Sequence, residues 1–307
     1  MSVLWQDLRY ALRQVKGNPG FTAAAVLTLA LGIGANTAVF SLVNGVLLRP
    51  LPYAEADRLY TLLEQRSPDD ARLASYPTFV DWHAQIDGFD KLAYVRGVTM
   101  IFRGPDGPEQ VLAGYVSEDF LAAVGGQPML GRGFQPEEYR GGASQVALIS
   151  HKLWRRRFGG SPAAVGQEMR LGDASYTIVG VMPEGFAYPE WASLWAPLAA
   201  LPANDKVVLT QRGNHVDSRV IGRLRAGVTL AAAQVQADAV AARIAAAYPA
   251  ENEGWTRIQP IALREQVLGD ARPRLLVLSV AVGLVLLIGC SNLINLWLAR
   301  ATARSSE

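Results

Sequence analysis

Charged residues are absent from two long stretches of the chain, 21–48 and 275–299. The first stretch has 28 residues and the second has 25. As α-helices these stretches are roughly 42 Å and 37 Å long, enough to cross a ~30 Å hydrocarbon core with some tilt. The pattern therefore predicts a membrane protein in which two transmembrane helices bracket a domain of residues 49–274.

The two predicted spans differ in composition. The second is rich in Leu, Val and Ile on every face, whereas the first also contains polar residues, namely Thr22, Thr28, Asn36, Thr37, Ser41 and Asn44. A buried helix of a soluble protein is the alternative for either span, and a cleavable signal peptide is a further alternative for the first. The uncharged run of the first span exceeds the usual apolar region of a signal peptide, which favours a transmembrane helix.

Small and polar residues within the spans predict contacts with other helices. Gly32 and Gly34 permit close approach in the first span, while Asn292 and Asn295 place polar groups in the second. Polar groups at membrane depth usually face other helices rather than lipid. Cys290 also lies in the second span, where we expect a small packing residue.

The short basic flanks predict the orientation. Arg9, Arg13 and Lys16 precede the first span, and Arg300 and Arg304 follow the second. Because such residues favour the cytoplasmic side, both termini are expected in the cytoplasm and the domain on the opposite, extracytoplasmic side of the membrane.

The N-terminal segment, residues 1–20, has apolar residues at helical spacing with Trp5 beside them. This spacing predicts an amphipathic helix that lies on the cytoplasmic face of the lipid membrane, and packing on another protein chain is equally compatible with it. Asn18, Pro19 and Gly20 are expected to end this helix before the span.

The middle of the chain alternates between strand and helix patterns, which predicts an α+β domain. Expected helices begin at Pro77, after Ser117, after Ser150 and near Thr229. Ser117 and Ser150 are the expected caps, and Pro77 suits the first turn of its helix. The long last helix is expected to bury Ala233, Ala237, Val240, Ile244 and Tyr248. Expected strands cover 94–102, 111–116, 146–149, 176–181, 219–224 and 258–263.

Overall composition agrees with this division of the chain. Charged residues make up 18% of all 307 residues, and about 22% once the two spans are removed, close to the ~25% of soluble domains. The net charge of +2 gives no reason to expect nucleic acid as a partner, and a single cysteine excludes a disulfide framework.

No motif for catalysis is present. The sequence contains neither a phosphate-binding loop nor a Gly-x-Ser-x-Gly elbow, and His83, His151 and His215 stand far apart. We therefore name no catalytic, cofactor-binding or metal-binding residue and expect no enzymatic activity. Arg155, Arg156 and Arg157 form the only dense basic run. It is compatible with a solvated helix end or with contact to lipid headgroups or an acidic partner.

Recognisable motifs lie along nearly the whole chain, at 18–23, 29–41, 47–53, 75–82, 114–117, 130–132, 153–160, 180–186, 225–229, 269–273 and 295–300. Together they resemble the motifs of MacB/FtsX-type ABC transporter permeases in a bacterial inner membrane, especially the large duplicated permeases of acidobacteria. The resemblance implies an extracytoplasmic MacB-like core domain, made of a porter-like α/β layer with a mostly β insert at about 117–201.

The resemblance also implies a permease subunit of an efflux or mechanotransmission complex. ATP is then expected only on a separate ABC ATPase subunit, with a homodimer or second permease half and a periplasmic protein as further partners. The family continues beyond Arg304 into a coupling segment and further spans. We therefore expect residues 300–307 to begin that cytoplasmic region, in a fragment or truncated product of a longer permease. The alternative is a membrane-anchored periplasmic scaffold or sensor without transport activity.

Overall fold

The computed structural model describes residue 5 and residues 19–44, 51–104, 107–142, 145–269 and 271–305. The chain divides into two compact units, one of residues 1–50 with 267–307 and one of Leu51–Gln266. The amphipathic helix expected over residues 1–20 lies almost wholly outside the described residues. We describe the two units separately.

The first unit contains two long helices, α2 (Pro19–Val43) and α9 (Ala271–Ser305). They contact each other, and a Cβ built on Gly32 would lie 2.8 Å from Leu286 Cδ1. The side chain of Asn36 donates to the carbonyl oxygens of Gly32 and Val282 at 2.9 Å and 3.4 Å. The contact expected at Gly32 is therefore with the other span of the same chain.

The other contacts expected of the spans are not made among the described residues of this unit. Gly34 has no atom within 4 Å of a built Cβ, and Asn292 and Asn295 are exposed. Each helix contains a window that is long and apolar enough to cross a membrane, and only 6% of each window is buried. Neither window therefore has the burial of a helix in a soluble core.

The second unit is built on a mixed sheet of eleven strands among the described residues. The strands are β1 (Leu59–Ser67), β2 (Asp70–Arg72), β3 (Phe89–Gly104), β4 (Gly107–Val116), β5 (Leu130–Gly131), β6 (Val146–Ile149), β7 (Glu168–Leu171), β8 (Ala174–Val181), β9 (Leu194–Pro197), β10 (Ser218–Leu224) and β11 (Arg257–Ala262). Their order is β11-β1-β10-β3-β4-β9-β6-β8-β5, with β2 on β1 and β7 joining β3 to β8. Only the β4–β9 and β6–β8 pairs are parallel.

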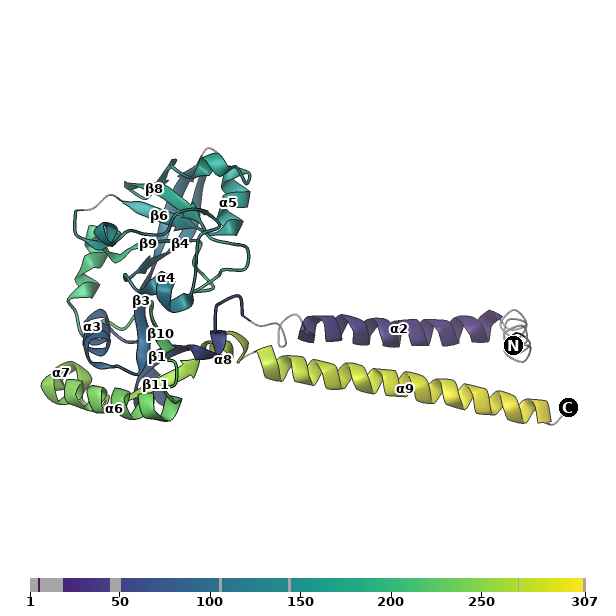
Figure 1. Cartoon of the computed structure of the whole chain (residues 1–307). Helices are drawn as coiled ribbons and strands as arrows, with labels where there is room; N and C mark the ends of the chain where they lie inside the picture. Colours follow the sequence, from purple (N-terminus) through teal and green to yellow (C-terminus); the bar gives the residue numbers. More distant parts are fainter. Residues whose placement is uncertain are drawn as a thin grey trace. The chain divides into compact units, whose positions relative to one another are not determined.

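Strands β3 and β4 run through two lobes of this unit (Figure 1). The first half of β3 pairs with β10, and its far end pairs with β7 at Phe102. The first lobe holds β1, β2, β10 and β11, and the second holds β5 to β9. All five strands of the second lobe lie within the range 117–201 that the resemblance implies for an insert.

Helices cover both faces of the sheet, so its central strands are buried on both sides. One apolar cluster joins alternate strand residues to α3 (Tyr76–Gln85), α5 (His151–Phe158) and α6 (Leu230–Ala247). The other joins the remaining strand residues to α4 (Phe120–Val124) and to the aromatic loop at Phe186 and Tyr188. Two short helices, α7 (Pro249–Asn252) and α8 (Leu263–Leu268), flank β11 along the chain.

The helix starts lie close to the predicted positions. Ser150 accepts the backbone N–H three residues ahead, as expected, and Ser75 and Thr229 cap α3 and α6 in the same way. Ser117 is the exception, because α4 begins after Asp119 and the Ser117 hydroxyl instead accepts from the Tyr94 backbone N–H at 2.9 Å. The hydroxyl is thus used to join β4 to β3.

The other corrections concern one side chain and several strands. Tyr248 is 43% exposed at the end of α6, because the chain turns there into α7 and leaves the buried face. Strands β1, β2, β5, β7 and β9 are absent from the strands predicted from the sequence. β3 is longer than predicted, since it extends from Phe89 to Gly104.

Candidate functional site

Helix α3 in the first lobe lies beside two pockets. Its first turn is fixed by Ser75, whose hydroxyl accepts from the Thr78 N–H, and its buried face carries Phe79 and Trp82. The opposite face leaves Val80 and His83 exposed. Side chains on the exposed face of α3 are therefore accessible to ligands, while its other face packs in the core.

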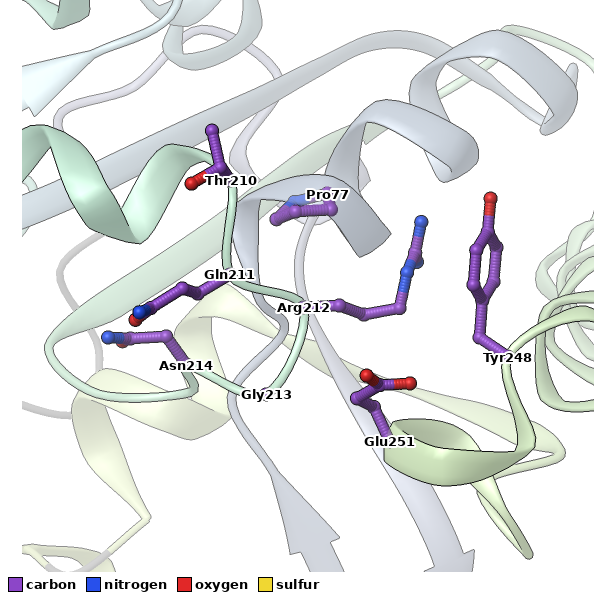
Figure 2. A pocket seen from close by; sticks show the side chains of 8 residues that line it. All are labelled: Pro77, Thr210, Gln211, Arg212, Gly213, Asn214, Tyr248 and Glu251. Atoms are coloured by element: carbon purple, nitrogen blue, oxygen red, sulfur yellow. The ribbon is translucent and has the colours of Figure 1, made fainter.

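The first pocket, here called the polar pocket, has a volume of about 630 Å³. Figure 2 shows its lining residues, which come from the start of α3, the loop before β10 and the α6–α7 turn. They are Pro77, Thr210, Gln211, Arg212, Gly213, Asn214, Tyr248 and Glu251.

Arg212 holds the wall of the polar pocket in place. One terminal guanidinium nitrogen lies 2.8 Å from Asp81 Oδ2, and the guanidinium carbon lies 3.7 Å from the centre of the Tyr248 ring. The other terminal nitrogen lies 3.4 Å from the Thr78 hydroxyl. Ion pairing and a cation–π contact thus occupy the arginine, and they join three elements that are distant in sequence.

The second pocket, here called the aromatic pocket, lies where α3 faces the β4–α4 connection. It has a volume of about 390 Å³ and is lined by Tyr76, Phe79, Val80, His83, Ala84, Ser117, Glu118, Asp119, Tyr139 and Leu198. Apolar and aromatic walls with a few polar groups are typical of ligand sites.

Asp119 is the charged centre of the aromatic pocket. Its two carboxylate oxygens lie 2.9 Å from His83 Nε2 and 2.8 Å from Lys91 Nζ. Burial opposes the charged form of Asp119, but hydrogen bonds from Lys91 and His83 outweigh it and lower the pKa of this carboxyl. The same hydrogen bond raises the pKa of Lys91. Asp119 therefore joins α3, β3 and the start of α4 through charged contacts.

The three histidines have structural contacts. His83 pairs with Asp119, and His215 Nδ1 lies 2.9 Å from the Leu73 carbonyl oxygen. The ring of His151 packs 5.4 Å from that of Trp154. None of these contacts joins a histidine to a nucleophilic hydroxyl or thiol, the arrangement that nucleophilic catalysis requires. The described residues contain no group of three acidic, histidine or cysteine side chains that could hold a metal.

The basic run on α5 is partly neutralised. Arg156 and Arg157 both pair with Glu109 on β4, and Arg157 also stacks over Phe102 at 5.6 Å. These contacts attach α5 to the sheet, which is a packing role beyond the solvated helix end expected from the sequence. Contact with lipid or an acidic partner stays a prediction.

Sequence reasoning missed both pockets. The loop 210–214 shows only as a polar segment in the sequence, and its partners Asp81 and Tyr248 are far away along the chain. The proximity of these residues depends on the order of strands in the sheet. No local sequence pattern indicates this proximity.

Comparison with known proteins identifies the domain. The model of the MacB-like periplasmic core domain family matches residues 22–240. The periplasmic region of MacB from Actinobacillus actinomycetemcomitans is similar in structure, with a TM-score of 0.51 and 10% identity, over 76% of this chain and 98% of that chain. No curated protein matches the sequence.

Two further solved domains are similar. A domain of a protein described as a permease, from Porphyromonas gingivalis, gives a TM-score of 0.52 at 18% identity over 69% of this chain and 93% of that chain. The extracellular domain of the noncanonic ABC-type transporter YknZ from Gram-positive bacteria gives 0.49 at 13% identity, over 66% and 99%. At these identities the structures of MacB and the Porphyromonas protein show a shared fold.

Proposed function

The chain belongs to the MacB-like periplasmic core domain family, and on this premise we propose that it is the transmembrane subunit of an ABC-type efflux or mechanotransmission complex. In this role, α2 and α9 cross the inner membrane and the unit Leu51–Gln266 works in the periplasm. We expect an ABC ATPase to supply the energy from outside residues 1–307, which contain no phosphate-binding loop.

The observation that carries this proposal is the pairing of two exposed, apolar helices at the two ends of one periplasmic-type domain. Close contacts at Gly32 and Gly289 let α2 and α9 pack tightly, as small residues do in membranes. Because both helices are covalently continuous with the domain, a movement of the pair driven from the cytoplasm is transmitted to it.

Purification of the tagged chain, within the full product of its gene, from native membranes tests the role. We expect an ABC ATPase to co-purify, and we expect vanadate trapping of that ATPase to change the accessibility of the periplasmic domain to protease. Recovery of envelope proteins without any ATPase would refute the transport role and support the scaffold or sensor alternative.

Cysteine labelling tests the topology separately. In a Cys290→Ser background, an Asp173→Cys variant is expected to react with a membrane-impermeant maleimide in cells with a permeabilised outer membrane. Asp173 is exposed in the turn between β7 and β8. Ser2→Cys and Ser306→Cys are expected to react only after lysis. Labelling of Ser2→Cys in unlysed cells would contradict the proposed orientation.

A further inference from the structure

We propose that the polar pocket binds a primary ammonium group carried on a small molecule with further hydrogen-bonding groups. Nothing in the family match assigns a ligand to this pocket. The proposal is independent of the coupling to an ATPase.

The first argument is the charge that remains in the pocket. Its lining contains two charged side chains, Arg212 and Glu251. The charge of Arg212 is neutralised by Asp81, with 2.8 Å between the charged groups and a side chain only 12% exposed. The carboxylate of Glu251 has no partner among the described residues. The pocket therefore has a net negative charge and favours a cation.

Neighbouring cations do not neutralise Glu251. Arg72 approaches this residue, but its Nη2 donates to the Glu251 backbone carbonyl at 2.9 Å, and its Nε donates to the Glu64 carboxylate at 2.5 Å. Arg66 pairs with Asp70 at 3.7 Å. Both guanidinium groups lie over the ring of Trp255. The Glu251 carboxylate is thus left available to a ligand.

The second argument is the presence of further hydrogen-bonding groups in the lining of the same pocket. The side-chain amides of Gln211 and Asn214 line the same pocket and have no partner among the described residues. In Figure 2 these two amides lie together on one side of the loop, and Glu251 lies beyond Gly213. Amides donate and accept, so they suit the hydroxyls of a sugar or the peptide groups of a chain.

The third argument excludes the opposite ligand charge. An anion would have to bind Arg212, but Asp81, Thr78 and the Tyr248 ring already surround that guanidinium. It would also meet the free carboxylate of Glu251. An ammonium group, with three donors and a compact charge, has a free acceptor instead.

Two sources carry this chemistry, an amino sugar and the N-terminus of a peptide. The test measures binding to the full chain in detergent micelles by isothermal calorimetry, with glucosamine and tri-alanine amide as probes. N-acetylglucosamine and N-acetyl tri-alanine amide are the matched ligands without the ammonium group. We expect one amine to bind with a Kd on the order of 1 mM, as suits a single open site, and its acetylated form to bind at least tenfold more weakly.

Variants locate the binding. Glu251→Gln, which keeps the size of the side chain, is expected to weaken amine binding at least fivefold without changing the thermal midpoint. Asn214→Ala is expected to weaken it about threefold. The control is Glu253→Gln, an exposed carboxylate two residues away that does not line the pocket. Equal binding of acetylated and free amines, absence of binding by either amine, or equal effects of the Glu251 and Glu253 variants would each overturn the proposal.

Discussion

Replacement of Glu64 is expected to destabilise the domain strongly, because its buried carboxylate joins three segments. The side chain is 3% exposed, and one oxygen accepts from Arg72 Nε at 2.5 Å. The other accepts from Asn252 Nδ2 at 3.2 Å, and His215 Nδ1 lies 3.5 Å away. Glu64 lies on β1, so these contacts tie the sheet to α7 and to the loop before β10.

The expected loss of stability depends on the contacts that Arg72 keeps when Glu64 is replaced. Removal of one member of a buried ion pair costs about 3–5 kcal/mol. Arg72 is partly exposed and retains the Glu251 carbonyl and the Trp255 ring, so Glu64→Leu should cost about 3 kcal/mol, near the low end of that range. For a unit of this size that corresponds to a fall in Tm of about 6–12 °C.

The assay is equilibrium urea unfolding of the full chain in micelles, followed by tryptophan fluorescence. Glu137→Leu, at an exposed carboxylate, is the control and is expected to change the free energy of unfolding by less than about 0.5 kcal/mol. The double variant Glu64→Leu with Arg72→Leu should recover part of the loss, since no charge is then left unpaired. A loss below about 1 kcal/mol for Glu64→Leu, or strict additivity in the double variant, would refute the reasoning.

Three further predictions concern separate features. Burial lowers the pKa of His215 below 6.5. The free energy of unfolding is therefore unaffected by this group above pH 6.5 and decreases as the pH drops towards the folded pKa. Urea unfolding at pH 7.5 and 5.5 should show this loss of stability, and His215→Gln should reduce it. The lowered pKa of Asp119 contributes stability above pH 3.8 that disappears below it. Asp119→Asn should therefore cost up to about 1 kcal/mol at pH 7 and progressively less as the pH falls through the folded pKa, and a cost that does not change with pH would contradict the pairing. Thr28→Cys with Gly289→Cys, in a Cys290→Ser background, should form a disulfide in membranes, because Thr28 Cγ2 lies 3.0 Å from a Cβ built on Gly289. Thiols that stay free on oxidation would show that α2 and α9 do not pack as described.

Local features of the fold were predictable because they have local causes. Ser75, Ser150 and Thr229 cap helices in the structure as their sequence context indicates. A side-chain oxygen at these positions satisfies a backbone N–H that the helix leaves free, so the signal lies within four residues. Ser117 has the same local context, but the pairing of β4 with β3 gives its hydroxyl another donor.

Strands that were missed lack the alternation on which the prediction depends. Strand β9 is buried at all four positions because β4 and β6 flank it and both faces of the sheet are covered. Its sequence, Leu194 to Pro197, is too short to separate a buried strand from a buried loop. Strand β1 carries Glu64 and Gln65 within its buried length, and these polar residues hide its apolar pattern.

The polar pocket is likewise not predictable from the sequence. Arg212 faces Asp81 and Tyr248 only because β10 pairs with β3 and α6 returns across the same face of the sheet. A site assembled from a helix start, a loop and a turn between helices has no fixed spacing in the sequence, unlike a phosphate-binding loop, whose backbone is itself the ligand cradle. The unpaired Glu251 carboxylate and the ion-paired Arg212 guanidinium are therefore identified from contacts in the structure and not from a sequence motif. The Glu251→Gln titration tests that recognition directly, because the substitution removes the charge and keeps the size of the side chain.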